Sequence, residues 1–222
     1  MHRPLLLGHR GARAVRSLRE NTPASFDRAL ADGCDGFEFD VRLTADGEAV
    51  VCHDPKFGRI EVSRASAGRL SDLPRLGQVL ERYKAAFLDI ELKVGGLETA
   101  VIDALRRHKP PRFVVSSFLP EVLEVVHKAD ATIPLGLICE TKGQLRRWNQ
   151  FPIMYVIANQ SLTDRRLIQE AHGSGKKVLV WTVNAVTLMM RFAEWQIDGI
   201  ISDNTTRLCR ALSRPVASRP HG

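Results

Sequence analysis

Short apolar segments alternate with amphipathic segments along nearly the whole chain, and this alternation constrains the possible fold more than any other feature. The apolar segments have the length and composition of buried strands, whereas the segments between them have the periodicity of helices that pack on one face. Eight strands, each followed by a helix, are typical of a closed barrel. The sequence therefore predicts an α/β protein with a (β/α)8, or TIM barrel, architecture.

The elements can be placed by residue number. The expected strands are 5–11, the first arm of a hairpin within 36–54, 85–93, 112–118, 133–139, 153–159, 177–184 and 199–203. Helices are expected after Thr22 and near 74–83, 97–108, 120–129, 142–149, 163–172, 186–195 and 205–212. Residues 56–71 have no clear period and are expected to form a loop. We assign 1–212 to one domain and the Pro-, Ser- and Arg-rich residues 213–222 to a disordered tail.

The hairpin predicted at 36–54 brings polar side chains together. Asp46-Gly47 favours a two-residue type I′ turn, and pairing outward from that turn sets Arg42 against Val51 and Asp40 against His53. Glu38 lies two residues before Asp40 and shares its face, because side chains alternate along a strand. We therefore expect two carboxylates and an imidazole to converge where the hairpin rises above the carboxyl-terminal face of the barrel.

Further polar residues are predicted at the ends of other strands. Each of the following is predicted at the carboxyl end of a strand: His9, Arg10, Glu38, Asp40, Glu91, Lys93, Ser117, Trp181 and Asp203. Barrel enzymes carry their catalytic groups on this face. The sequence thus predicts an active site there.

The residue types point to phosphoryl chemistry. Glu38, Asp40 and Glu91 supply three hard oxygen ligands and no thiol, a set that suits one divalent cation, Mg²⁺ or Ca²⁺. His9 and His53 offer a proton donor and a proton acceptor near neutral pH. Positive charge for an anionic oxygen comes from Arg10 and Lys93.

Composition excludes several other classes of protein. The net charge is +7, but arginine is spread through every segment and no basic block is interleaved with aromatics, so we expect no nucleic-acid partner. No apolar run approaches the length of a transmembrane helix, and the start of the chain is a poor secretory signal. The four cysteines form no paired motif, which favours a reducing, cytoplasmic location. The sequence does not determine the oligomeric state.

Eight short motifs occur in a characteristic order. They are HRG (9–11), E-N-T (20–22), E-x-D-V (38–41), DG…VV-x-HD (46–54), E-x-K (91–93), SSF (116–118), WTVN (181–184) and DGIISD (198–203). With these motifs the chain resembles the glycerophosphodiester phosphodiesterases from about residue 5 to residue 205.

The resemblance implies a metal-dependent hydrolase that cleaves small glycerophosphodiesters to sn-glycerol 3-phosphate and an alcohol. It implies roles for ten residues: Glu38, Asp40 and Glu91 as metal ligands; His9 and His53 as acid and base; Arg10, Glu20 and Lys93 as phosphate and glycerol contacts; and Phe118 and Trp181 as walls of the mouth. The sequence leaves the acid and base roles of the two histidines unassigned.

One departure from the family pattern concerns the substrate. The segment after the HD pair, 54–73, is short and lacks the L-D-R-T-T-x-G motif common in the family. With few side chains to grip the leaving alcohol, we expect preferences among head groups to stay within about one to two decades. Two alternatives are a lysophospholipase D-like activity on larger lipid phosphodiesters and a non-catalytic barrel that binds phosphodiesters.

Overall fold

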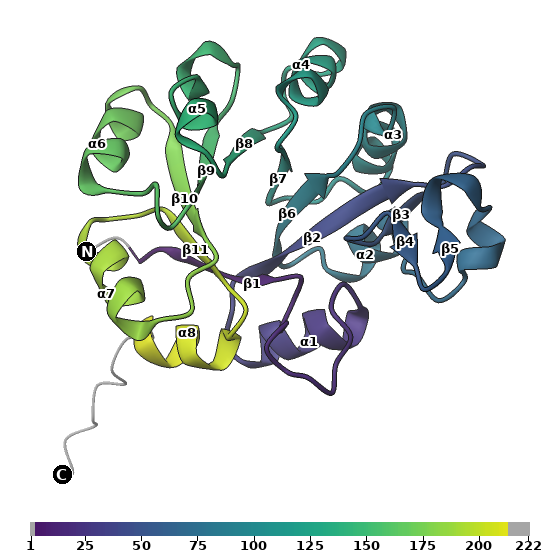
Figure 1. The fold of residues 1–222 in the computed structure, drawn as a ribbon, viewed down its shortest axis with the longest axis horizontal. Helices are drawn as coiled ribbons and strands as arrows, with labels where there is room; N and C mark the ends of the chain where they lie inside the picture. The colour runs from purple at the N-terminus through teal and green to yellow at the C-terminus, as the bar shows by residue number, and fades with distance from the viewer. Residues whose placement is uncertain (1–2, 213–222) are drawn as a thin grey trace.

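Eight parallel strands close into a barrel in the computed structural model, which describes residues 3–212 (Figure 1). In order around the barrel they are β1 (Leu5–His9), β2 (Gly36–Leu43), β6 (Phe87–Leu92), β7 (Phe113–Ser117), β8 (Leu135–Cys139), β9 (Tyr155–Asn159), β10 (Lys177–Trp181) and β11 (Gly199–Ser202). Strand β1 pairs with both β2 and β11, and these two pairings complete the ring. The predicted TIM barrel is confirmed.

Helices surround the strands on the outside (Figure 1). They are α1 (Pro23–Ala31), α2 (Leu76–Arg82), α3 (Glu98–His108), α4 (Pro120–Ala129), α5 (Lys142–Leu145), α6 (Arg165–Gly173), α7 (Val186–Glu194) and α8 (Thr205–Leu212). The helix expected at 142–149 is broken, because α5 ends at Leu145 and a separate 3-10 turn, η3 (Trp148–Gln150), follows it. Helix α5 buries none of its own residues, so packing does not stabilise a longer helix there.

Apolar side chains fill both sides of the strands. The larger cluster lies between the strands and the helices and includes the stacked rings of Phe26 and Phe37, whose centroids are 4.1 Å apart. A second, separate cluster consists of Leu7, Phe87, Val114, Ile138, Tyr155, Ile157, Leu179 and Ile201. Because these eight residues come from seven strands of the ring, they fill the barrel interior and form the floor beneath the polar strand ends.

The hairpin forms with a different register from the one predicted. Strand β3 (Ala49–Val51) pairs with β2 so that Arg42 faces Val50, one residue away from the expected partner Val51. The turn has three residues rather than two, with Gly47 at a φ of 78°, a conformation that glycine adopts without steric cost. Asp46 Oδ1 fixes this turn by accepting hydrogen bonds from Thr44 Oγ1 at 2.6 Å and from the Ala67 amide at 2.9 Å.

Residues 56–71, expected as a loop, contain regular structure. A two-stranded ribbon of β4 (Lys56–Phe57) and β5 (Ile60–Glu61) precedes two 3-10 turns, η1 (Val62–Arg64) and η2 (Ala67–Leu70). Their apolar residues pack against β3 in a small cluster of Val50, Cys52, Val62, Ala65, Leu70 and Leu73. The loop expectation was wrong here, because such widely spaced apolar residues match neither a helical nor a strand period.

The predicted disordered tail, 213–222, lies outside the described residues. Within residues 3–212, no helix has the length and apolar character needed to cross a membrane.

The fold depends on a close approach between β2 and β6 at Gly36. A Cβ atom at this position would lie 1.8 Å from the carbonyl oxygen of Phe87, which is its partner in the strand register. Because the obstacle is backbone, Gly36→Ala should destabilise the protein by about 3 kcal/mol. The matched change Gly173→Ala in α6 meets nothing within 4 Å and should stabilise the protein by up to about 1 kcal/mol. Urea unfolding of both variants checks this, and similar midpoints for the two would contradict it.

Candidate active site

A cavity of about 350 Å³ opens at the carboxyl ends of the strands. Eight of the ten predicted site residues line it: His9, Arg10, Glu38, His53, Glu91, Lys93, Phe118 and Trp181. The two others contact the lining, since Asp40 lies beside Lys93 and Glu20 pairs with Arg10. The structure therefore brings all ten together, while their chemical roles stay predictions.

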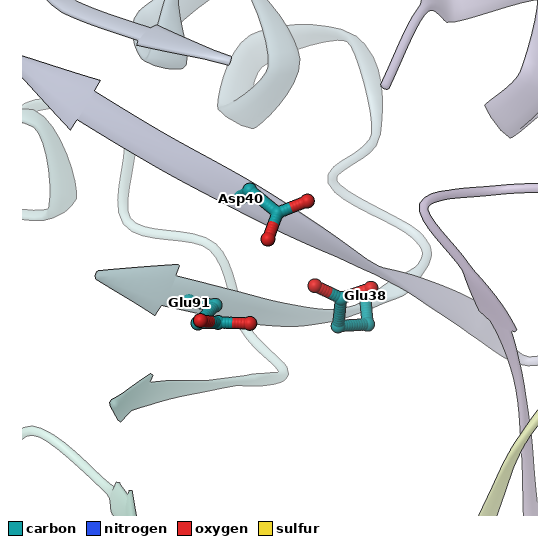
Figure 2. A group of neighbouring side chains, drawn as sticks. All are labelled: Glu38, Asp40 and Glu91. Atoms are coloured by element: carbon teal, nitrogen blue, oxygen red, sulfur yellow. The ribbon is translucent and has the colours of Figure 1, made fainter. Parts of the chain in front are cut away.

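Three carboxylates form the centre of the site (Figure 2). Glu38 and Asp40 come from β2, and Glu91 comes from the adjacent position on β6, where the strand register pairs it with Asp40. Each contributes an oxygen that lies within 4.8 Å of the others. Glu38 Oε1 is buried and has no hydrogen-bond partner among the described residues. A buried, unsatisfied oxygen in a set of three hard ligands fits a single divalent cation.

Each carboxylate of the cluster affects the ionisation of the others. Burial, and then the charges of Asp40 and Glu91, raise the pKa of Glu38 well above its ordinary value. Burial and the charge of Asp40 likewise raise the pKa of Glu91 to about 7. Burial also opposes ionisation of Asp40, but Arg10, Lys93 and an amide hydrogen bond outweigh it and lower the pKa of Asp40. Ionising all three acids would place more negative charge in the cluster than its neighbours neutralise, and a bound cation would favour the ionised forms.

Two basic side chains hold the cluster together. Lys93 Nζ lies 2.6 Å from Glu91 Oε1 and 3.3 Å from Asp40 Oδ1. The Arg10 side chain lies between two acids, with Nε 3.3 Å from Asp40 Oδ2 and Nη1 2.8 Å from Glu20 Oε1. The Arg10 amide also donates to Glu38 Oε2 at 2.9 Å. Both cations face the cavity and are positioned to bind an anion there.

His9 is oriented by an acid from the other end of the chain. Its Nδ1 lies 2.7 Å from Asp203 Oδ1, and its Nε2 lies 3.8 Å from Glu38 Oε2. Although burial opposes it, hydrogen bonds from His9 and Asn184 lower the pKa of Asp203, so this carboxylate is ionised and can only accept. The proton of neutral His9 is then on Nδ1, which leaves Nε2 as an acceptor beside the carboxylate cluster.

His53 approaches the same cavity from the hairpin. Strand β3 ends at Val51, and the Cys52 amide donates to the Asp40 carbonyl, so Cys52 and not His53 is the residue opposite Asp40. The chain leaves the strand at this point, and the His53 ring still reaches the cavity with its Nδ1 2.8 Å from Asp54 Oδ1. Its side chain is 31% exposed, against 13% for His9. Burial is the largest of the effects that lower the pKa of His53.

Sequence reasoning assigned no role to two residues that support the site. Asn21 donates from Nδ2 to Asp40 Oδ2 at 2.7 Å, and its Oδ1 accepts from the Asp40 amide at 3.3 Å. Asp89 lies in the cavity floor, where burial raises its pKa to about 7 and Ser116 Oγ donates to it at 2.6 Å. The sequence contains a signal for each residue. Asn21 lies within the E-N-T motif, and Asp89 shares a strand face with Glu91.

Comparisons with known proteins agree on one family. Residues 9–93 and 89–207 match the sequence profile of the glycerophosphoryl diester phosphodiesterase family. The chain is 29% identical to a glycerophosphodiester phosphodiesterase of Caldanaerobacter subterraneus subsp. tengcongensis, over 95% of this chain and 98% of that one.

Solved structures with the same fold include two bacterial proteins. One is a phosphodiesterase of Oleispira antarctica in complex with the product sn-glycerol-3-phosphate, with a TM-score of 0.83, 25% identity, and coverage of 96% of this chain and 98% of that one. The other is described as a putative glycerophosphoryl diester phosphodiesterase of Silicibacter pomeroyi, with a TM-score of 0.84, 25% identity, and coverage of 94% and 93%.

The contact between His9 and Asp203 should make stability depend on pH. Because the folded state lowers the pKa of Asp203, the ionised carboxylate stabilises the fold above its unfolded pKa of about 4, and this contribution is lost as pH falls below that value. Asp203→Asn should therefore cost about 1–3 kcal/mol at neutral pH, and the difference from wild type should shrink progressively below about pH 4. Urea unfolding across this range checks it; a constant difference at every pH would contradict it.

Proposed function

The chain belongs to the glycerophosphoryl diester phosphodiesterase family, and we propose that it hydrolyses small glycerophosphodiesters to sn-glycerol 3-phosphate and an alcohol by metal-dependent acid–base catalysis. The observation that carries this proposal is one cavity lined by Glu38, Glu91, two histidines and two cations, with Asp40 completing the carboxylate cluster beside Lys93. An acid, a base and phosphate-binding charges within one site are the requirements of phosphodiester hydrolysis.

The product assignment has support from a relative and from charge. The Oleispira antarctica structure is a complex with the product sn-glycerol-3-phosphate, the compound that the reaction proposed for this chain would release. In this chain Arg10 and Lys93 supply two positive charges at the cavity, which suits the single negative charge of a phosphodiester and the greater charge of the product. Glu20 fixes the Arg10 guanidinium through its 2.8 Å contact, and its carboxylate can accept a hydrogen bond from a glycerol hydroxyl.

Glu38, Asp40 and Glu91 would hold one divalent cation, Mg²⁺ or Ca²⁺. A bound cation supplies Lewis-acid polarisation of a phosphoryl oxygen and offsets the repulsion among the three carboxylates. Lys93 and Arg10 would keep the ligands oriented, because each contacts Asp40 from a different side.

In the proposed reaction the glycerol 2-hydroxyl attacks phosphorus. His9 takes the hydroxyl proton at Nε2, while Asp203 stabilises the imidazolium that forms. The bond between phosphorus and the leaving alcohol breaks, and His53 protonates that alcohol. Water then opens the 2,3-cyclic phosphate, with the two histidines exchanging roles. We assign the base to His9 because it is the more buried ring beside the carboxylate cluster, and the acid to His53 because it lies nearer to solvent, where the alcohol departs.

A small substrate is favoured over a larger lipid. A lysophospholipase D-like enzyme needs apolar surface beside the mouth for an acyl chain. The large hydrophobic side chains most exposed in residues 3–212 are Val125, Met154, Val186 and Met190, and none of them lines the cavity.

Metal binding should be measurable without turnover. Saturating Mg²⁺ or Ca²⁺, at about 100 times Kd, should stabilise the wild type by about 2.7 kcal/mol and raise its Tm by about 5–10 °C. Glu38→Gln should lose this response and its activity, yet be at least as stable as wild type in EDTA, because it replaces a carboxyl group whose ionised form is disfavoured by burial and by Asp40. Glu124→Gln, at an exposed position of α4, should respond like wild type. A Glu38→Gln protein that keeps the full Tm shift would remove Glu38 from the metal site.

Substitutions of the two histidines should have different effects when the leaving group changes. His9→Ala and His53→Ala should each lower kcat for glycerophosphocholine by about 10²–10⁴-fold. In the p-nitrophenyl ester of glycerol 3-phosphate the leaving group departs without protonation, so first-turnover release of p-nitrophenol should regain most of the wild-type rate in His53→Ala and little of it in His9→Ala. Rescue of His9→Ala instead would reverse the assignment, and near-normal kcat in either variant would exclude that histidine from the mechanism.

A further inference from the structure

The cavity has two chemically different sides. The phosphate-binding and acidic groups come from β1, β2 and β6, and the opposite side is formed by residues of β7 to β11 and the residues that follow them. Strand β8 lies four positions from β1 in either direction around the ring, so it is directly across the mouth from His9. The residue that follows β8 is Glu140, and it lines the cavity.

The side opposite the carboxylates offers little to a hydroxyl group. Its lining residues are Phe118, Ile138, Ile157, Trp181 and Ile201, together with Glu140. The indole N–H of Trp181 is already used, because it donates to the Ile157 carbonyl at 3.2 Å. A polyol on this side would leave hydroxyls unsatisfied, which is costly. The two hydroxyls of the glycerol group are therefore expected to bind near Arg10, Glu20 and Lys93. The leaving alcohol is then expected on the opposite side of the cavity.

Aromatic rings and a carboxylate define the chemistry of that side. Phe118 and Trp181 meet edge to face, with centroids 5.6 Å apart and planes at 84°. Glu140 is exposed, and neither an ion pair nor a hydrogen bond is found for its carboxylate within residues 3–212, although its backbone amide donates to Gln144 Oε1. Lys93 Nζ already lies 5.7 Å from the Phe118 ring centroid, so Trp181 and Glu140 provide the remaining contacts for a cation. A quaternary or primary ammonium group suits them, because its charge is attracted to an aromatic face and to a carboxylate. A trimethylammonium group also needs no hydrogen bonds.

Resting on the proposed function, we infer that this side of the cavity is a subsite for a positively charged leaving alcohol, and that Glu140 selects for the charge. Choline and ethanolamine esters are then preferred over neutral and anionic esters. Because Glu140 is exposed and solvent screens it, the preference is modest, about tenfold in kcat/KM. A tenfold preference lies within the range of one to two decades in kcat/KM that the sequence predicts. The inference adds that the head groups are ranked by their charge.

The decisive comparison uses two esters of equal shape. Glycerophosphocholine and the 3,3-dimethylbutyl ester differ only in that a carbon atom replaces the quaternary nitrogen. Wild type should have a kcat/KM about tenfold higher for the choline ester, and this ratio should fall as ionic strength rises. A ratio near one in low salt would overturn the inference.

A matched pair of variants tests whether Glu140 is the residue that selects for charge. Glu140→Gln should lower kcat/KM for the choline ester about threefold to fivefold and leave the neutral ester unchanged. Glu121→Gln, which removes an exposed acid from α4 outside the cavity lining, should change neither. If Glu140→Gln lowers kcat/KM equally for the two esters, Glu140 does not select for charge. If wild type hydrolyses neither ester, the proposed function fails, whereas hydrolysis of both at equal rates contradicts only the subsite.

Discussion

Mutual repulsion among buried carboxylates is the constraint on which the rest of this site depends. Glu38, Asp40 and Glu91 are each less than one tenth exposed, so water cannot screen them. Coulomb interactions at such short range are strong in a low-dielectric interior, and unpaired buried charge is costly. Lys93 and Arg10 offset part of this cost through their contacts with the cluster. The raised pKa values of Glu38 and Glu91 reduce the rest of this cost, because they favour the neutral forms of these acids.

Strand register is what keeps the acids in place. Asp40 and Glu91 are paired positions on β2 and β6, and Glu38 is two residues earlier on the same face of β2. Glycine at position 36 allows the two backbones to approach closely at the start of that pairing. A change far below the cavity therefore acts on the carboxylate geometry through the shared strands. This makes the site a property of the whole β2–β6 pair rather than of a loop.

The barrel and most of the site were predictable because their signals are local. Alternation along 85–93 correctly places Glu91 and Lys93 on one face, and strand ends meet at one face of any parallel barrel. The hairpin register was predicted wrongly because Asp46-Gly47 suits both two-residue and three-residue turns, and the choice depends on contacts with Ala67 outside the hairpin. The contact of His9 with Asp203 joins residues 194 positions apart, so no local pattern indicates it. Glu140 follows β8 as an ordinary exposed acid, and only closure of the ring places it across from His9.

The two sides of the cavity differ in how freely they can vary. Groups on β1, β2 and β6 contact one another through ion pairs, so a substitution at Arg10 or Lys93 changes the charge balance of all three acids. Within residues 3–212 the opposite side has no such network of ion pairs, because its apolar residues pack into the barrel floor and Glu140 projects from a strand end. In the proposed reaction, selection among leaving alcohols can therefore change by single substitutions there without disturbing the acid cluster. A single barrel can thus keep one phosphodiester chemistry and present different chemical surfaces to the departing group.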